Sequence, residues 1–254
     1  MQQYFVNGRA PQGVFQISDQ ATVKHMFSVM RLVEDDQVLL VFEDGVKRLA
    51  KVVSSVNHQL EILEELADNV ELPVSVTIAS GFPKGDKLDL ITQKATELGA
   101  TAIWAYPADW SVVKWDGKKL AKKAEKLAKI AQGAAEQSKR NRLPEVCLFE
   151  TKTVFLSRLA QFDKVLIAYE ETAKAGDKAS LAGELTRVKP GESLLFIFGP
   201  EGGLSPQEIV DFERAGGIQV GLGPRILRTE TAPLYALSAV SFAVELTGVE
   251  EAGQ

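Results

Sequence analysis

The 254-residue sequence predicts an α/β protein in which a small β-rich module precedes a larger parallel sheet. From Val74 onward, short apolar and β-branched runs alternate with helical patterns, which is typical of parallel strands covered by helices on both faces. Before Pro73, strand-like runs instead follow one another with turns between them. We therefore expect two domains, residues 1–72 and residues 73–254, with the boundary at Pro73.

The N-terminal domain is expected to be a barrel-like sheet with one helix. The turn Glu43-Asp44-Gly45 separates two of its strands as a hairpin would. A further pattern of apolar residues at helical spacing follows Ser18, which suits the N-cap position. The expected elements are a helix from Ser18 to Leu32 and strands at 37–42, 46–56 and 60–63.

In the C-terminal domain, strands and helices alternate along the chain. The strands are expected at 74–79, 102–105, 165–168, 194–198 and 218–220. The helices between them are expected at 87–98, 118–138, 205–215 and 232–246. Open parallel sheets bind their ligands beyond the carboxyl ends of the strands. The loops that follow the strands are therefore the places to look for a site.

Charge is unevenly distributed along the chain. The formal net charge is −5, yet residues 114–142 carry ten basic and three acidic side chains, so this segment is +7 and the rest is −12. Such a segment can attract phosphate with an affinity that falls as salt rises. The alternative is an ordinary solvated helix face.

The remaining composition excludes several classes of protein. One cysteine, Cys147, rules out an internal disulfide, and with only two histidines the chain has too few soft ligands for a zinc cluster. No apolar run is long enough to span a bilayer, and the N-terminus lacks the pattern of a signal peptide. We expect a cytoplasmic protein without a metal and without a membrane anchor.

The loop after the strand at 194–198 is rich in glycine. It reads Gly199-Pro200-Glu201-Gly202-Gly203, and Ser205-Pro206-x-Glu208 then begins a helix with a capping box. Glycines let the backbone approach a ligand closely. The loop matches neither a P-loop nor the dinucleotide fingerprint G-x-G-x-x-G. The alternative is a tight strand-to-helix turn with no ligand.

A second loop, 221–231, also lies between a strand and a helix, and Thr231 is expected to cap that helix. Its charged residues Arg225, Arg228 and Glu230 stand beside the apolar pair Ile226-Leu227. Exposed amides next to an apolar surface suit a nucleoside ligand. The alternative is a structural loop whose charges face water.

Taken together, these motifs resemble the RsmE family of SPOUT methyltransferases. The resemblance rests on GPEGG at 199–203 and LGPRILRTETA at 222–232, and it extends to three further pieces. These are His25-Met26-Phe27-Ser28-Val29-Met30-Arg31-Leu32, Gly85-Asp86-Lys87 with Gln93-Lys94-Ala95-x-Glu97-Leu98-Gly99, and Ala135-Glu136-Gln137-Ser138. The pieces occur in the family's order and cover residues 5–242. One departure is Asp109-Trp110-Ser111, where the family usually has Glu-Arg-Ser.

The resemblance implies a fold, a cofactor and a substrate. The fold is a SPOUT-type parallel sheet with a C-terminal trefoil knot, preceded by a PUA-like RNA-binding β-barrel. The cofactor is S-adenosyl-L-methionine, released as S-adenosyl-L-homocysteine, and the protein is a homodimer. The substrate is 16S rRNA of the small ribosomal subunit, methylated at N3 of uridine 1498. Whether free rRNA or the assembled subunit is bound stays open.

The same resemblance implies roles for particular residues. Three loops would hold the cofactor, one starting at Ala168-Tyr169-Glu170. The expected cofactor-binding residues are Ala168, Tyr169, Gly199, Pro200, Glu201, Gly202, Gly203, Leu222, Gly223, Ile226, Leu227 and Arg228. The expected catalytic residues are Arg228, Glu230 and Glu201, although either glutamate could instead hydrogen-bond loop amides. The expected RNA contacts are Arg9, Arg31, Lys84, Arg140 and the lysine-rich helix.

Two other functions fit the sequence. One is a SPOUT ribose 2′-O-methyltransferase acting on rRNA or tRNA, which would share the cofactor loops but usually lacks the motif at His25–Leu32. The other is a non-catalytic ribosome-assembly factor that uses the barrel and the basic helix alone. Binding of S-adenosylhomocysteine would argue against the latter.

Overall fold

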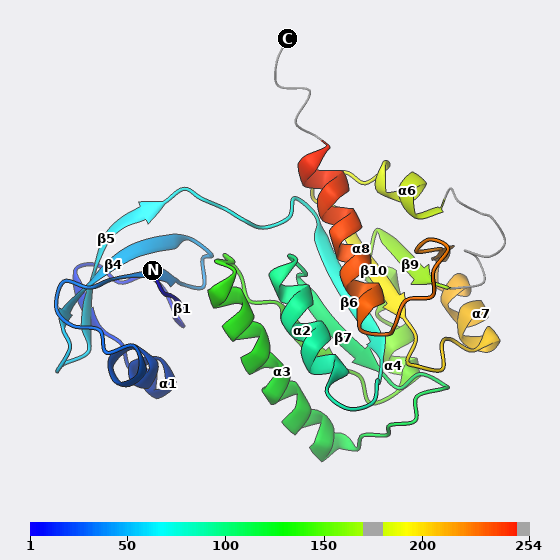
Figure 1. Ribbon diagram of the computed structural model, residues 1–254, viewed down its shortest axis with the longest axis horizontal. Coiled ribbons are helices and arrows are strands. Elements are labelled where there is room, and N and C mark those ends of the chain that lie inside the picture. Colours follow the sequence, from blue (N-terminus) through cyan, green and yellow to red (C-terminus); the bar gives the residue numbers. More distant parts are fainter. Residues whose placement is uncertain (170–179, 248–254) are drawn as a thin grey trace, which may run out of the picture. The chain divides into compact units, whose positions relative to one another are not determined.

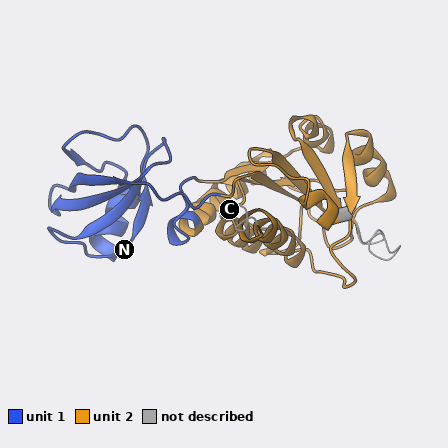
Figure 2. Ribbon diagram, turned by 90° about the horizontal axis from the view of Figure 1, so that it is seen from above, with its two compact units in different colours: residues 1–71, 135–142 blue, residues 72–134, 143–254 orange. Residues whose placement is uncertain are grey.

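The computed structural model describes residues 1–169 and 180–247. They form two compact units, coloured separately in Figure 2. Unit 1 comprises residues 1–71 and 135–142, and unit 2 comprises the other described residues. Unit 1 thus includes residues 135–142 from the middle of the chain, whereas the expected division had a single boundary at Pro73.

Unit 1 is built on a curled five-stranded sheet in the order β1-β3-β4-β5-β2. Its strands are β1 Gln3–Phe5, β2 Val14–Gln16, β3 Gln37–Val41, β4 Lys47–Ser54 and β5 Gln59–Leu66. The three longer strands agree with the sequence prediction and pair antiparallel. The two short ones, β1 and β2, were not predicted, since three residues carry too little periodicity. Tyr4, Met26, Leu40 and Leu60 form part of the core.

The helical segment of unit 1 begins one residue later than predicted. Asp19, and not Ser18, is the N-cap of α1 (Gln20–Val23), and its carboxylate accepts from the Thr22 amide at 2.7 Å. The segment then continues as the π-helix η1 (Lys24–Val29). His25 in η1 shares a 3.1 Å hydrogen bond with the Tyr4 hydroxyl, which gives this histidine a structural partner.

Residues 135–142 are attached to unit 1 by a buried ion pair. The Glu71 carboxylate accepts from Nε of Arg140 at 2.8 Å and from the amides of Asn141 and Arg142 at 2.8 and 3.2 Å. The Asn141 side chain adds a bond to the Gly45 carbonyl at 3.1 Å. Arg140 is only 2% exposed. Its expected contact with RNA is therefore not supported, because the guanidinium is enclosed and already paired.

Unit 2 contains a parallel six-stranded sheet in the order β11-β9-β10-β6-β7-β8. Its strands are β6 Ser75–Gly81, β7 Ala102–Tyr106, β8 Glu145–Leu148, β9 Lys164–Ala168, β10 Ser193–Phe198 and β11 Gly217–Val220. The parallel α/β fold class predicted from the sequence is confirmed. Strand β8 was not predicted, as its four residues alternate only weakly in burial.

Helices cover both faces of this sheet (Figure 1). They are α2 Lys87–Glu97, α3 Gly117–Gln137, α4 Lys152–Leu156, η2 Leu159–Gln161, α6 Ser180–Leu185, α7 Pro206–Arg214, α8 Thr231–Ser241 and η3 Phe242–Leu246. Ile91 of α2 and Leu237 of α8 pack with Phe196 on one face. Phe155 of α4 and Phe212 of α7 pack with Ile197 on the other. The alternating side chains of β10 thus face two separate cores.

The sheet order determines which loops become neighbours. Strands β11, β9, β10 and β6 are adjacent and parallel, so the loops that follow them emerge at the same edge of the sheet. These include both glycine-containing loops singled out in the sequence. Among the described residues, none of the helices combines the length and apolar character needed to cross a membrane.

The buried pair in unit 1 makes a prediction about stability. Burial alone would raise the pKa of Glu71, but hydrogen bonds from Arg140 and two amides outweigh it and hold this pKa below its ordinary value of 4.5. Glu71→Ala leaves the Arg140 charge buried and unpaired, so we expect the free energy of unfolding at neutral pH to fall by about 3 kcal/mol. Urea denaturation measures this loss.

Glu125→Ala is the matched control, since Glu125 and its partner Lys129 are both exposed, and it should change stability little.

The pH dependence of the stability has a definite sign. A carboxyl group whose pKa is lower in the folded state than in the unfolded state stabilises the protein at pH values above the unfolded-state pKa. This stabilisation is lost as the pH falls through the folded-state pKa. The deficit of Glu71→Ala should therefore shrink below pH 4.5. An equal deficit at all pH values would contradict this account.

Candidate functional site

A cavity of about 640 Å³ opens at the carboxyl edge of the unit 2 sheet. All twelve residues expected to bind a cofactor line it, and they come from the loops after β9, β10 and β11. Glu170, which continues the first of these loops, lies outside the described residues. The volume is in the range that small organic ligands occupy in proteins.

The loop after β10 is shaped by contacts that only glycine permits. A Cβ atom on Gly199 would lie 2.5 Å from the carbonyl carbon of Gly203, so the two ends of the loop touch through bare backbone. Gly203 itself has φ +80°, a conformation that side chains disfavour. The predicted capping box is confirmed: Ser205 Oγ accepts from the Glu208 amide at 3.1 Å, and Glu208 accepts from the Ser205 amide at 2.9 Å.

The loop after β11 supplies the apolar and cationic parts of the wall. Leu222, Ile226 and Leu227 line the cavity, and Ile226 is 73% exposed. The Arg228 carbonyl accepts from the amides of Thr231 and Ala232 at 2.8 and 3.0 Å, which starts α8. The N-cap of α8 is Glu230 and uses no side-chain hydrogen bond, so the expectation that Thr231 caps this helix was wrong.

Two arginines present their charges at this wall. The side chains of Arg225 and Arg228 are exposed, line the cavity, and form no ion pair with any described residue. An unpaired guanidinium retains its full capacity to bind an anionic or carbonyl group. Arg228 is therefore the better placed of the three expected catalytic residues.

The two glutamates are arranged differently. Lys87, at the start of α2, contacts Glu201 at 2.8 Å and Glu230 at 3.5 Å. Glu201 also accepts from the Lys84 amide at 3.0 Å, the loop-amide alternative noted from the sequence. Burial would raise the pKa of Glu201, but Lys87 and backbone amides hold the pKa below its ordinary value. A carboxylate with a lowered pKa is a weaker proton acceptor.

Glu230 does not line the cavity. Its side chain is 19% exposed. Its Oε2 atom is buried and lies 3.5 Å from Lys87 Nζ, yet it accepts no hydrogen bond from a described residue. Such an atom can accept a hydrogen bond from a ligand or a water molecule. Glu201 is the more fully engaged of the two, since it contacts Lys87 at 2.8 Å and also accepts from the Lys84 amide.

Among the lining residues that were not predicted, Lys87 and Trp110 come from other parts of the chain. Lys87 begins α2, directly after the loop that follows β6, and Trp110 lies on the loop that follows β7. Strand β6 pairs with β10, and β7 pairs with β6. Their proximity to Gly199–Gly203 follows from the strand order and not from spacing along the chain. No local pattern marked them, because the adjacency of β6 and β10 joins residues more than a hundred positions apart.

The other expected RNA-binding residues lie on the surface of their own units. Arg9 and Arg31 are exposed in unit 1, and Lys84 is exposed in unit 2. The lysine-rich helix α3 presents an exposed set on one side, while Leu120, Leu127 and Ala131 face the core. The exposed set is Lys118, Lys119, Lys122, Lys126 and Lys129. Lys123 differs because it is partly buried, and both Lys123 and the exposed Lys126 pair with Asp89, at 2.8 and 2.5 Å.

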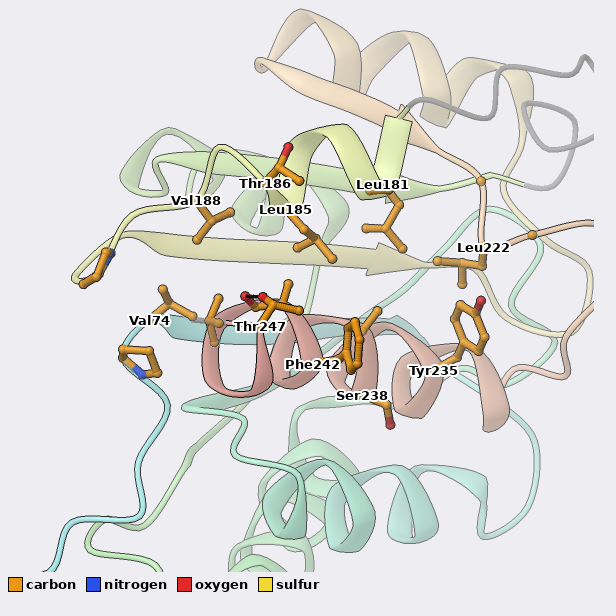
Figure 3. Close-up of a pocket in the computed structure, with 18 of the residues that line it drawn as sticks. Val74, Leu181, Leu185, Thr186, Val188, Leu222, Tyr235, Ser238, Phe242 and Thr247 are labelled. Atoms are coloured by element: carbon orange, nitrogen blue, oxygen red, sulfur yellow. Dashed lines mark hydrogen bonds between the residues drawn. The ribbon is translucent and has the colours of Figure 1, made fainter. Parts of the chain in front are cut away.

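A second, more apolar groove of about 1200 Å³ lies in unit 2 between α6 and the continuous helix α8–η3. Figure 3 shows Leu181 and Leu185 facing it from one side and Phe242 and Tyr235 from the other. Several large apolar side chains of α8–η3 are exposed, with Tyr235 at 41%, Phe242 at 60% and Leu246 at 66%. An apolar strip of this kind is typical of a protein–protein contact.

Comparison with known protein families identifies both units. Residues 70–241 match the RNA methyltransferase domain family, and residues 17–65 match the RNA methyltransferase PUA domain family. The SPOUT-like parallel sheet and the PUA character of unit 1 are thereby confirmed. The trefoil knot stays a prediction.

Individual relatives agree with these matches. Ribosomal RNA small subunit methyltransferase E of Bacillus subtilis is 44% identical, over 97% of this chain and 98% of its own. A Neisseria gonorrhoeae protein of the same name, solved with S-adenosyl methionine, is 28% identical with a TM-score of 0.77 over 95% and 97% of the two chains. A Legionella pneumophila protein described as a methyltransferase, solved with the bound cofactor SAM, is 29% identical with a TM-score of 0.81 over 95% and 97%. The chain belongs to the ribosomal RNA small subunit methyltransferase E family.

Proposed function

We propose that this protein transfers a methyl group from S-adenosylmethionine to N3 of uridine 1498 in the 16S rRNA of the small ribosomal subunit. The observation that carries the proposal is the cavity in unit 2, where three strand-end loops bring together all twelve residues expected around the cofactor. Relatives of the same fold bind this cofactor. A ribosomal substrate would place the reaction in the cytoplasm.

The residues present fit the cofactor chemically. Leu222, Ile226 and Leu227 offer an apolar surface for a base, and the glycine loop exposes backbone amides to polar groups. Bound S-adenosylmethionine supplies a methyl group that is already electrophilic on its sulfonium. The protein therefore has to position the uracil in line with that methyl group and to exclude other acceptors. We further propose that the three loops are tied in the family's trefoil knot.

The uracil N3 has to lose its proton, since this imide is mostly protonated at neutral pH. Arg228 can stabilise the negative charge that then develops on the uracil oxygens, because its guanidinium is unpaired at the cavity wall. The proton passes to Glu230, whose Oε2 atom has no described hydrogen-bond partner, or to solvent. Glu201 keeps Lys87 and the 84–87 loop against the glycine loop.

We propose that the active form is a homodimer in which the α8–η3 face meets a second copy of the chain. The apolar groove and the exposed Tyr235, Phe242 and Leu246 support this arrangement. Cyclic dimers bury the same patch on both subunits, and such a patch is expected to be apolar.

The direct test of the function is the mapping of modified uridines in rRNA from cells with and without this protein. N3-methyluridine at position 1498 should vanish when the gene is removed and return with the purified enzyme and S-adenosylmethionine. Nucleoside mass spectrometry separates this product from a 2′-O-methylated nucleoside. The appearance of the latter instead would establish the ribose methyltransferase alternative.

The glycine loop gives a prediction about cofactor binding. In Gly199→Ala the new methyl group would overlap the Gly203 backbone, so the loop must open. We expect affinity for S-adenosylhomocysteine, measured by calorimetry, to fall at least about tenfold. Gly133→Ala is the control, because a Cβ at this position of α3 meets no atom within 4 Å. Unchanged affinity in Gly199→Ala would place the cofactor elsewhere.

A second prediction separates RNA binding from catalysis. Replacing Lys118, Lys119 and Lys122 by glutamine removes exposed charges that would contact phosphate, so RNA affinity should drop. The salt slope should decrease by about one unit for each phosphate that is no longer neutralised. Arg228→Ala should instead slow single-turnover methylation at saturating RNA. The opposite pattern in the two variants would mean that these roles are reversed.

The dimer is tested by sedimentation at micromolar concentration. The wild-type protein should sediment at twice the chain mass, and Phe242→Glu should shift it to the monomer by burying a charge in the contact. Val210→Glu is the control, since Val210 is 38% exposed on α7, which packs on the other face of the sheet. A monomeric wild-type protein, or a dimer that survives Phe242→Glu, would refute the proposed contact.

A further inference from the structure

Trp110 is the tryptophan that this chain presents to the cavity. Trp104 is 4% exposed and packs edge-on against Phe149 in the core. Trp115 packs at a tilt against Phe82, with the ring centres 4.4 Å apart. Trp110, by contrast, is 48% exposed and lines the site. An indole left half open beside a binding cavity costs hydrophobic stabilisation, which a bound partner would restore.

The indole is held against the glycine loop. A Cβ on Gly202 would lie 3.0 Å from the Cβ of Trp110, and a Cβ on Gly203 would lie 3.9 Å from its Cζ3 atom. Because Gly202 and Gly203 have no side chains, the indole ring of Trp110 can occupy the space next to them. Trp110 and Arg228 thus line the same cavity.

The turn that carries Trp110 is fixed on several sides. The Asp109 carboxylate accepts from Ser205 Oγ and from Lys152 Nζ, both at 2.6 Å. The Asp109 amide donates to the buried Glu208 carboxylate at 3.0 Å, and the Ser111 amide closes the turn on the Ala108 carbonyl at 2.9 Å. An aromatic ring on an anchored turn loses little conformational entropy when a ligand stacks on it.

We propose that Trp110 is the surface on which a nucleobase of the RNA substrate stacks beside the cofactor cavity. The proposal rests on the RNA methylation proposed above. A base reaching this site has to leave its helical stack, and proteins commonly compensate for lost stacking with an aromatic side chain. Arg225 and Arg228, unpaired at the same cavity, can hold the phosphates or carbonyl groups that accompany the base.

The test uses Trp110→Ala, Trp110→Phe and Trp110→Arg in the full-length protein. Small ribosomal subunits from cells lacking the enzyme serve as substrate, and the Kd for S-adenosylhomocysteine is measured alongside. Loss of one stacked base should weaken RNA binding by Trp110→Ala roughly tenfold, which is more than the variant weakens binding of S-adenosylhomocysteine. Trp110→Phe should largely restore binding. Trp110→Arg should restore it with a salt slope steeper by about one unit, because a phosphate contact replaces stacking.

Fluorescence supplies a readout that does not depend on methylation. A short oligouridylate should quench the emission of the wild-type protein but not that of Trp110→Phe, in which only Trp104 and Trp115 emit. Equal quenching in both proteins would overturn the inference, as would parallel losses of cofactor and RNA affinity in Trp110→Ala. If quenching occurs but no uridine is methylated, the proposed function fails while the stacking surface stands.

Discussion

The buried carboxylate of Glu208 is the interaction on which the geometry of the site depends. It is fully buried, and its two oxygens accept from the amides of Ser205 and Asp109 at 2.9 and 3.0 Å. One bond belongs to the loop after β10 and the other to the loop after β7. Burial raises the pKa of Glu208, yet the two amides favour the charged form and so limit the rise. A single side chain thus fixes two loops that the chain separates by about ninety residues.

The close approach within the glycine loop follows from this anchoring. Ser205 ends the loop as the N-cap of α7, so the chain has only the five residues 199–203 and Leu204 to turn from β10 to the helix. A turn this short brings Gly199 against Gly203, where no Cβ atom fits. The backbone of this part of the cavity wall is consequently fixed by contacts within the protein.

The sequence alone predicted the parallel sheet, its four long helices and the two glycine-containing loops, and these features rest on local patterns such as the apolar runs and the capping box at Ser205. The twelve residues expected around the cofactor came from the family resemblance, and they line one cavity. The features missed from the sequence depend on partners distant along the chain. The family resemblance implied that Arg140 contacts RNA, but this arginine is buried and paired with Glu71. Lys87 and Trp110 reach the site only through the strand order.

The charged side chains at the cavity fall into two groups, those that form ion pairs with described residues and those that do not. Glu201 and Lys87 neutralise each other at 2.8 Å, so a ligand that engages either one must first disrupt this pair. A ligand that binds Arg225 or Arg228 does not have to disrupt an ion pair, since neither arginine forms one within the part of the chain that the structure describes. A paired charge sets the shape of a site, whereas an unpaired charge is free to bind an incoming group. Within the described residues, the pair of Glu201 and Lys87 therefore holds two segments together, while the two arginines remain available to an incoming group.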